Sequence, residues 1–400
     1  MNEASQQATE QRVQALIARW RSGYSLEQEF YSDADVFARD VERVFHQNWL
    51  LVGHVARVPR RGDFFLTQIA QTTLIIVRSA DDKIHALVNL CRHRGSTLCG
   101  RSEGNAKSFA CPYHAWVYDT RGELLRAKHM PDGFDPTEYR LHRAAVRVFE
   151  GLIFINLAEQ PRDLGPAIND LTPYVGPHGL KDAAIAHREV FTMEANWKLA
   201  IENYLECYHC PVAHPEYAIV HDDENMDRML EWLQLAGKLG HKVGGVGREG
   251  LAVPPTVQDY GVTRIPLREG FLTSSRDGKP LAPLMGSLAD YDGGQTYMAI
   301  GPVSFGVADS DHAIILCFLP SSPTSTRVEI SWLVAGDAVE GIDYQLDDLL
   351  WMWGRTIRQD LTVVKAQQQG IGSRFYEPGP YSRHEGQLER WNTWYLEQIR

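Results

Sequence analysis

The 400-residue sequence has little of what marks several classes of protein. It contains only six cysteines, far too few for a disulfide scaffold. No apolar run approaches the ~20 residues that a membrane span needs, and the polar first residues show no signal peptide. Acidic residues number 51 against 40 lysines and arginines, a formal charge of −11, so the basic surface that nucleic acids require is lacking. We expect a cytoplasmic globular protein with no membrane or nucleic-acid partner, whose cysteines are free thiols or metal ligands.

The character of the chain changes along its length. Residues 12–19 and 35–46 have the apolar spacing of short helices. From about 63 to 157, short runs rich in valine, isoleucine, phenylalanine and tyrosine alternate with turn residues, which indicates a small antiparallel β domain. Residues 158–183 are rich in proline and glycine, and we expect a domain boundary there.

The second half of the chain predicts a mixture of helices and strands. Residues 184–193 have the composition of a strand, and the runs HAIILCFL and RVEISWLV predict a strand pair. Apolar spacing predicts a helix over 196–209 and a long helix from 342 to about 368. Residues 217–312 favour long loops.

Two short motifs in the β-rich segment each pair a cysteine with a histidine. Cys91 and His93 form a C-x-H, and Cys111 and His114 form a C-x₂-H in a later loop. Two thiolates and two imidazoles can bind zinc or one iron–sulfur cluster. Zinc-finger spacing would put both cysteines in one pair, whereas here each loop supplies one of each. That crossed pattern favours a Rieske [2Fe–2S] centre over zinc and over a chance grouping of buried cysteines and surface histidines.

The stretch CRHRGSTLC…CPYHAW resembles the oxygenase version of the Rieske motif. Respiratory Rieske proteins carry an additional cysteine in each loop, and these two form a disulfide. The equivalent positions here are Ser96 and Tyr113, so that bridge cannot form, and we expect Cys99 to be a buried free thiol. The resemblance implies a cluster potential around −150 mV, which suits accepting electrons from a reductase.

A second group of polar residues lies in the stretch NWKLAIENYLECYHCPVAHP, residues 196–215. On a helix, Asn203, Glu206 and His209 share one face. Pro211 should end the helix, and His214 follows in a turn, so both histidines can reach one metal ion.

Three plainer interpretations of this stretch stay open on the residues alone. Lys198 and Glu202 have the spacing of a surface ion pair, and the polar face can point to water. Cys207 and Cys210 form a C-x₂-C that can be a zinc or redox site, although no second C-x₂-C accompanies it. A single histidine such as His214 is most often structural.

A carboxylate in the long predicted helix is a candidate third ligand. A 2-His-1-carboxylate triad needs one aspartate or glutamate and leaves positions open for O₂. Asp360 falls on the apolar stripe between Ile357 and Val364, where an unpaired carboxylate would be costly, so it needs a metal or a cation partner. A structural ion pair with an arginine is the alternative, and Asp347 and Asp348 lie off the stripe.

The pattern N-W-K-x₃-E-N-x₂-E-x-Y-H-x₄-H-P resembles the catalytic-helix signature of Rieske non-haem iron oxygenases. The resemblance implies that His209, His214 and Asp360 bind mononuclear iron. It also implies catalytic roles for Asn203 and for Glu206, which would bridge His209 to the Rieske His114 of a neighbouring subunit.

The resemblance covers nearly the whole chain and implies its fold. We expect an all-β Rieske [2Fe–2S] domain over residues 46–158. Residues 1–45 and 159–400 would form an α+β catalytic domain, a helix-grip (START-like) antiparallel sheet with a long C-terminal helix.

The implied function is that of a terminal oxygenase using O₂. Electrons would come from a separate NAD(P)H-dependent flavin or iron–sulfur reductase, since this chain shows no clear nucleotide-binding motif, and the chains would form a homotrimer. The stretches NYLECYHCPVAHP and SSRDGKPLAPLMG resemble the branch that oxidises quaternary ammonium compounds such as choline, glycine betaine, carnitine and proline betaine. Hydroxylation of an aromatic acid or ring is the alternative substrate class, and an electron-transfer protein without oxygenase activity is the alternative function.

Overall fold

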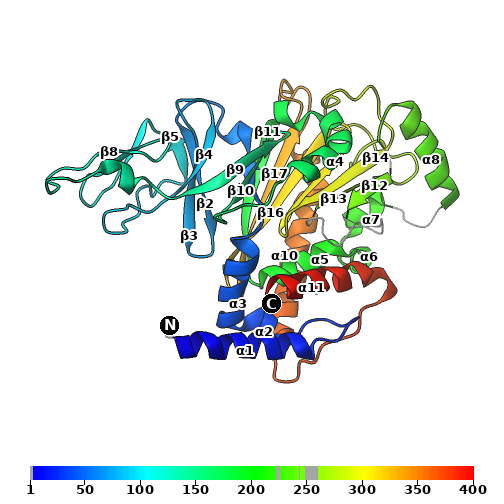
Figure 1. Ribbon diagram of the computed structural model, residues 1–400. Helices are drawn as coiled ribbons and strands as arrows, with labels where there is room; N and C mark the ends of the chain where they lie inside the picture. The colour runs from blue at the N-terminus through cyan, green and yellow to red at the C-terminus, as the bar shows by residue number, and fades with distance from the viewer. Residues whose placement is uncertain (1–2, 222–225, 243, 248–259) are drawn as a thin grey trace. The chain divides into compact units, whose positions relative to one another are not determined.

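The computed structural model describes residues 3–221, 226–242, 244–247 and 260–400 (Figure 1). The chain divides into two compact units, one formed by residues 45–164 and the other by residues 1–44 together with 165–400. Among the helices of the described ranges, none combines the length and the apolar character of a membrane span.

The unit formed by residues 45–164 is built almost wholly of antiparallel strands, as predicted. A seven-stranded sheet has the order β1-β10-β9-β4-β3-β2-β5, and a three-stranded sheet has the order β6-β7-β8. The strands are β1 Leu50–His54, β2 Asp63–Ile69, β3 Thr72–Arg78, β4 Ile84–Val88, β5 Glu103–Asn105, β6 Ser108–Ala110, β7 Val117–Asp119, β8 Leu124–Arg126, β9 Arg143–Phe149 and β10 Leu152–Asn156.

The core of this unit joins its two sheets to the cysteine-bearing loops. Phe64 of β2 and Phe109 of β6 meet edge to face, with ring centroids 5.4 Å apart. The buried cluster around them also contains Trp116 and both Cys91 and Cys111. The loops that carry the two cysteines are therefore anchored in the core by their first residue.

The other unit is built on one seven-stranded antiparallel sheet of order β11-β17-β16-β15-β14-β13-β12. The predicted strand pair is present as β16 and β17, with Ala313 opposite Leu333. The strands are β11 Ala184–Met193, β12 Gly244–Gly247, β13 Tyr260–Pro266, β14 Gly294–Ile300, β15 Ser304–Ala308, β16 His312–Ser322 and β17 Ser325–Val334. The helices are α1 Glu3–Arg19, α2 Gln28–Ser32, α3 Ala34–Asp40, α4 Gly165–Val175, α5 Trp197–Leu205, α6 Cys210–Ala213, α7 Pro215–Val220, α8 Met226–Lys238, α9 Leu346–Leu349, α10 Trp351–Ile371 and α11 Gly386–Gln398.

Helix α5 lies against this sheet and is in turn contacted by the long helix α10 (Figure 1). Tyr204 of α5 packs on Phe305 of β15 with ring centroids 4.1 Å apart. The helix starts at Asn196, whose side-chain oxygen accepts the Lys198 N–H at 3.0 Å as an N-cap. Apolar burial and the cap together fix the direction in which α5 runs toward the site.

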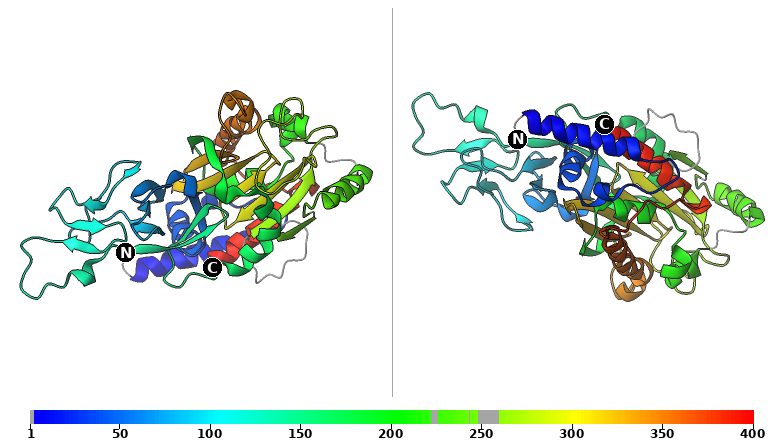
Figure 2. Two further views of the ribbon diagram at one scale, coloured as in Figure 1. Left: turned by 90° about the horizontal axis from the view of Figure 1, so that it is seen from above. Right: turned by 90° about the horizontal axis from the view of Figure 1, so that it is seen from below.

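Buried ion pairing ties the N-terminal segment to α5. The side chains of Lys198 and Asp40 are both completely buried and contact each other. Trp197 Nε1 and the Tyr395 hydroxyl also donate to Asp40, at 3.0 and 2.7 Å. Seen from below in Figure 2, α1 and α11, from the two ends of the chain, both lie on the near side. The termini of the chain are thus packed around one buried carboxylate.

Two expectations for this region are wrong. Lys198 and Glu202 do not form a surface ion pair, because both are buried, and Glu202 accepts the Tyr31 hydroxyl at 2.9 Å. Burial raises the pKa of Glu202 to about 8. The helix predicted over 196–209 ends at Leu205, and Glu206 is extended (φ −126°, ψ 159°). It ends because the Glu206 carboxylate accepts the N–H groups that would continue the helix.

The segment predicted to hold long loops is more regular than expected. Helix α8, the end of helix α7 and strands β12 to β15 lie within residues 217–312. The strands mix apolar residues with glycines and threonines, which hides their period, whereas the apolar spacing of α8 is a signal that could have found that helix. Part of the expectation falls on residues 222–225, 243 and 248–259, which lie outside the described residues.

Removing Asp40 should be strongly destabilising. In Asp40→Ala the ammonium group of Lys198 stays buried without its counter-charge, which typically costs about 3–5 kcal/mol. The midpoint of urea unfolding, followed by tryptophan fluorescence, measures the loss. Asp277→Ala is the matched control, because Asp277 pairs with Lys279 at 2.7 Å in an exposed position. Equal midpoints for the two variants would contradict a stabilising role for the buried pair.

Candidate metal centres and the adjoining pocket

The two cysteine–histidine loops of the β unit have the same backbone construction. In the first, Cys91 N–H bonds to Ser96 O at 2.8 Å, and in the second, Cys111 N–H bonds to Trp116 O at 2.7 Å. The residue four positions after each cysteine has a positive φ, +73° at Gly95 and +56° at Ala115. Each loop therefore turns tightly enough to bring its cysteine and its histidine to the same side.

The four candidate cluster ligands come together as the sequence predicts. Cys91 and Cys111 are buried free thiols that interact with each other. The rings of His93 and His114 lie at the exposed loop tips with centroids 4.6 Å apart. Burial opposes ionisation of Cys111, but the N–H groups of Tyr113 and His114 hold the pKa of its thiol below its ordinary value. Two thiols and two imidazoles in this arrangement fit a Rieske cluster.

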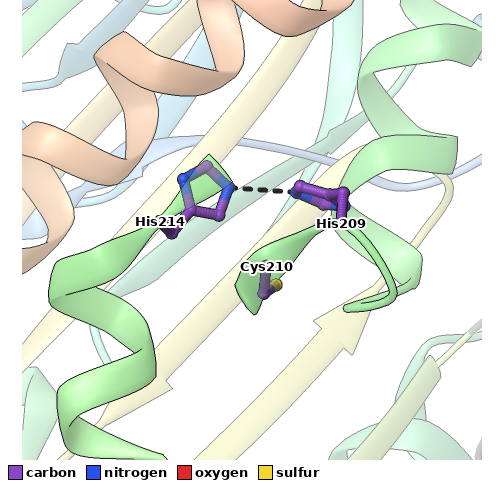
Figure 3. A group of neighbouring side chains, drawn as sticks. All are labelled: His209, Cys210 and His214. Carbon is purple, nitrogen blue, oxygen red and sulfur yellow. Dashed lines mark hydrogen bonds between the residues drawn. The ribbon is translucent and has the colours of Figure 1, made fainter. Parts of the chain in front are cut away.

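A second group of ligand-type residues lies in the α+β unit (Figure 3). His209 immediately precedes α6, and His214 precedes α7. Their Nε2 atoms face each other at 3.0 Å. Asp360 Oδ1, from α10, lies 3.0 Å from His214 Nε2 and 3.5 Å from His209 Nε2. Three potential ligand atoms thus converge from three separate elements.

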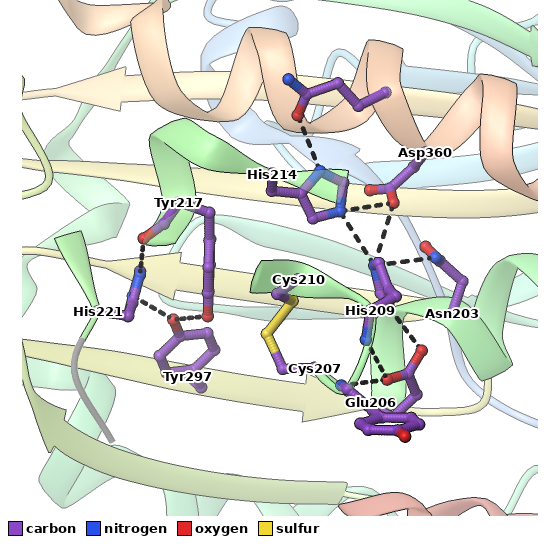
Figure 4. The surroundings of a disulfide bond; sticks show 12 residues. Asn203, Glu206, Cys207, His209, Cys210, His214, Tyr217, His221, Tyr297 and Asp360 are labelled. Carbon is purple, nitrogen blue, oxygen red and sulfur yellow. Dashed lines mark hydrogen bonds and ion pairs between the residues drawn. A yellow bond between two sulfur atoms is a disulfide. The ribbon is translucent and has the colours of Figure 1, made fainter. Parts of the chain in front are cut away.

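Hydrogen bonds on the far side of each ring set the tautomers (Figure 4). His209 Nδ1 lies 2.5 Å from Glu206 Oε1, and His214 Nδ1 lies 2.8 Å from Gln359 Oε1. Carboxylate and amide oxygens accept, so each Nδ1 carries the proton and each Nε2 presents a lone pair.

The facing lone pairs and the carboxylate fit a metal ion. Two acceptor nitrogens 3.0 Å apart cannot bond to each other unless one ring takes up a proton, and a metal ion between them satisfies both lone pairs. The buried Asp360 Oδ1 has no hydrogen-bond donor among the described residues, and a metal ion would satisfy it. We propose His209, His214 and Asp360 as the 2-His-1-carboxylate ligands of the mononuclear iron.

Polar residues behind His214 form a chain that the sequence did not reveal. Gln359 Nε2 donates to Glu216 Oε2 at 3.0 Å, and Arg355 donates to Glu216 Oε1 at 2.8 Å. The bonds from Gln359 and Arg355 lower the pKa of Glu216. No motif in the sequence singles out Gln359. Its spacing of four from Arg355 on a helix is the signal that could have found the pair.

The two candidate catalytic residues both contact His209. Asn203 Nδ2 lies 3.1 Å from His209 Nε2, on the side facing the proposed iron, and Glu206 holds Nδ1. The side chain of Glu206 is 11% exposed. Both predicted residues are therefore at the site, on opposite sides of one imidazole.

The expectation that the cysteines do not form disulfides is wrong for one pair. Cys207 and Cys210 are bonded, with an S–S distance of 2.01 Å. The Cys210 N–H bonds to Cys207 O at 3.2 Å, and this turn brings the two Cα atoms to 4.9 Å, inside the range that a disulfide spans. The sequence had left this C-x₂-C open as a zinc or redox site. Cys99, as expected, is a buried free thiol.

A pocket of about 380 Å³ opens on His209, His214 and Asp360. Its described lining has no lysine or arginine. Six aromatic side chains line it: Tyr204, Tyr208, Tyr217, Tyr297, Phe305 and Trp353.

A hydrogen-bonded group braces the aromatic wall from behind. The Tyr297 hydroxyl lies 3.0 Å from both the Tyr217 hydroxyl and His221 Nε2. His221 Nε2 also lies 3.0 Å from the buried Gln295. No motif in the sequence points to these residues, because they come from two elements far apart in the chain, the end of α7 and strand β14.

Comparison with known families assigns the two units. The model of the Rieske [2Fe-2S] domain matches residues 48–148, and that of the ring hydroxylating alpha subunit (catalytic domain) matches residues 180–400. This chain belongs to the Rieske ring-hydroxylating oxygenase alpha subunits. The oxygenase is therefore an oxidoreductase that carries a [2Fe–2S] cluster and a mononuclear iron. The predicted family, α+β fold class and cofactors are confirmed, and a Rieske electron carrier without oxygenase activity is excluded.

Three relatives illustrate how the similarity is distributed. The glycine betaine monooxygenase oxygenase subunit of Chromohalobacter salexigens is 36% identical over 379 residues, 92% of this chain and 84% of its own. The biphenyl dioxygenase subunit alpha of Metapseudomonas furukawaii is 35% identical over 201 residues, covering 46% of this chain and 43% of its own. The crystal structure of the quaternary ammonium Rieske monooxygenase CntA has the same fold, with a TM-score of 0.73 and 21% identity over 96% of this chain and 98% of that one.

Gln359→Leu should weaken iron binding by the oxygenase. The change removes the acceptor that fixes the Nδ1–H tautomer of His214, and such changes typically weaken metal affinity about 10- to 100-fold. Mononuclear iron retained against a graded series of chelator concentrations measures the effect, with the visible spectrum of the cluster as internal reference.

Gln367→Leu is the matched control for this variant. It makes the same change on an exposed residue of the same helix. Equal iron retention in the two variants would contradict the positioning role of Gln359.

Proposed function

We propose that the protein is a terminal oxygenase that hydroxylates an N-methyl group of a small quaternary ammonium compound. One atom of O₂ enters a C–H bond of the methyl group, and the other leaves as water with two electrons and two protons. The hydroxymethyl product then separates into formaldehyde, a tertiary amine and a proton. The observation that carries the proposal is an aromatic pocket with no lysine or arginine in its described lining, placed at the proposed iron ligands.

The chemistry of the pocket favours a cationic ligand. Aromatic faces attract a quaternary ammonium group, and each such contact contributes about 0.5–2 kcal/mol. Tyr217 and Trp353 meet edge to face with centroids 5.9 Å apart, so their faces point in different directions around the cavity. The glycine betaine monooxygenase relative supports this substrate class, because its similarity extends over 92% of the chain. The biphenyl dioxygenase relative supports the aromatic alternative over 46% only.

Each side chain of the site has a distinct role in this proposal. Cys91, His93, Cys111 and His114 hold the cluster, and His209, His214 and Asp360 hold the iron. When bound, these two centres supply the electrons and the activation of O₂. Residues 46–158 form the cluster domain, and residues 1–45 with 159–400 form the catalytic domain.

The proposal includes a route for electrons between subunits. The Glu206 carboxylate already holds His209 Nδ1, and we assign it as the link to His114 of a neighbouring subunit in a homotrimer. An NAD(P)H-dependent flavin or iron–sulfur reductase supplies the electrons, and the protein works in the cytoplasm.

The substrate class can be tested with shape-matched ligands. Glycine betaine and carnitine should raise the melting temperature of the holoenzyme, and 3,3-dimethylbutanoate should not, because it has the shape of glycine betaine without the cationic charge. With a reductase, turnover of the stabilising ligand should release formaldehyde. Stabilisation by benzoate or other aromatic acids, with none by the betaines, would instead identify the aromatic alternative.

Replacing Glu206 tests the route between subunits. Glu206→Gln keeps an oxygen that can accept the His209 Nδ1–H, so we expect about three irons per chain and almost no turnover. His114→Ala should also be inactive, through loss of the cluster.

Mixed oligomers give the decisive comparison. An oligomer of the two variants has an intact cluster in one chain and an intact Glu206 and iron in its neighbour. We expect such mixed oligomers to regain activity. They are made by co-expression of the two variants or by exchange of subunits between folded oligomers. Activity in Glu206→Gln alone, or no recovery in mixed oligomers, would contradict the bridge.

A further inference from the structure

We propose that Cys207 and Cys210 form a reversible thiol–disulfide site in the wall of the iron pocket, whose oxidation state controls retention of the iron. The inference rests on the proposed function, because it takes His209 as an iron ligand. The disulfide form holds iron firmly, and the dithiol form releases it in exchange for softer metals such as zinc.

The disulfide encloses one of the proposed ligands. The covalent ring formed by residues 207–210 contains His209, so the bond limits the backbone positions available to that residue (Figure 4). Both sulfur-bearing residues line the pocket. Cys207 is exposed and Cys210 is buried, so a small reductant or oxidant can reach the pair at Cys207.

His209 depends on this bond more than the other two ligands do. Asp360 lies within the long helix α10, and His214 is held by Gln359 at the start of α7. His209 follows the break after Leu205, in a stretch where side chains replace helical hydrogen bonds. Besides the disulfide, this stretch is held by the Glu206 carboxylate, by the N–H groups of Val212 and Ala213, which donate to His209 O, and by Tyr208, which stacks on His384 with centroids 5.7 Å apart.

Reduction would also place a soft ligand beside the iron site. Ligand atoms of His209, Cys210 and His214 all lie within 4.8 Å of one another (Figure 3). In the disulfide, the sulfur of Cys210 is occupied by its bond to Cys207. As a thiolate it becomes a third donor to the same ion, and thiolate ligands favour zinc over the harder Fe²⁺. Opening the bond therefore both loosens His209 and changes the metal preference of the group.

The exchange is balanced with named reactants. A dithiol reductant breaks the S–S bond through a mixed disulfide, so both cysteines become thiols and the reductant becomes a disulfide, a two-electron transfer. Hydrogen peroxide reverses it. One thiol becomes a sulfenic acid with loss of water, and the second thiol displaces a second water to form the bond. In a reducing compartment, disulfides are typically transient or redox-sensing, which agrees with a reversible bond here.

The oxidation state can be read directly from one peptide. Cleavage after Lys198 and Arg228 gives residues 199–228, which contain Cys207 and Cys210 and no other cysteine. The holoenzyme is treated with reduced dithiothreitol or with hydrogen peroxide, alkylated, digested and weighed by mass spectrometry. We expect full interconversion between the dialkylated and the bonded peptide. A peptide that stays dialkylated after peroxide, or bonded after dithiothreitol, would overturn the proposal.

Metal content then tests the consequence. Both forms of the wild-type holoenzyme are freed of reagent and challenged with excess Zn²⁺, and iron and zinc are counted against the two cluster irons. We expect the dithiol form to lose the third iron at least fivefold faster. Equal loss from the two forms would overturn this inference and leave the oxygenase proposal intact. A third iron missing from both forms before the challenge would contradict the proposed iron site itself.

Three single substitutions separate the two parts of the argument. Cys207→Ser leaves the Cys210 thiol free, so we expect rapid zinc uptake after treatment with either dithiothreitol or hydrogen peroxide. Cys210→Ser removes the sulfur near the histidines. We therefore expect the same rate of iron loss after either treatment, and little zinc uptake. Cys317→Ser, in β16, is the control, and its iron loss should differ between the two treatments as that of the wild type does. The visible spectrum of the cluster and the circular dichroism spectrum verify that each variant is folded. The comparison of the two wild-type forms does not depend on any variant.

Discussion

Two imidazole nitrogens with lone pairs facing each other across 3.0 Å, beside a carboxylate, form an arrangement that is unfavourable without a cation. The catalytic unit has to bring these three groups together from positions up to 151 residues apart in the chain, Asp360 being far from His209. Side-chain contacts must hold each of the three groups in place before the site can bind a metal ion. The structure meets this demand with a rigid sheet, two helices laid across it and a set of hydrogen bonds that fix each imidazole tautomer.

The buried pair of Lys198 and Asp40 explains why much of the pattern N-W-K-x₃-E positions the helix and takes no part in the reaction. Asn196 caps α5, and Trp197 and Lys198 both contact Asp40. Glu202 accepts a hydrogen bond from the hydroxyl of Tyr31, which also belongs to the N-terminal segment. These residues fix the position of the helix whose end carries the site, and only the positions from Asn203 onward touch the proposed ligands.

The sequence was informative wherever residue type alone constrains chemistry. Cysteine–histidine pairs, two histidines near a proline and an aspartate on an apolar stripe each have few stable explanations, so the candidate ligands could be named before the fold was known. The β runs were equally accessible, and a strong apolar period predicted a long helix from 342 to about 368, although the long helix observed spans 351–371 and the short helix 346–349 precedes it. The end of α5 was not, since it depends on a side chain of Glu206 bonding to backbone groups. The chain from His214 through Gln359 to Glu216 was also hidden, because it joins residues that only tertiary packing brings together.

The disulfide was missed for a related reason. Cysteine counts describe the whole chain, whereas a bond between residues three apart depends on one local turn. That turn exists because Glu206 stops the helix, so a single carboxylate sets both the backbone path and the tautomer of His209. In the proposed mechanism, iron retention and electron delivery would therefore be coupled. A change that moves the stretch 206–209 would shift a proposed iron ligand and the proposed electron link together, whereas Asp360 lies within α10 and His214 lies directly before α7. His209 would then be the ligand through which the iron centre is controlled without disturbing the rest of the fold.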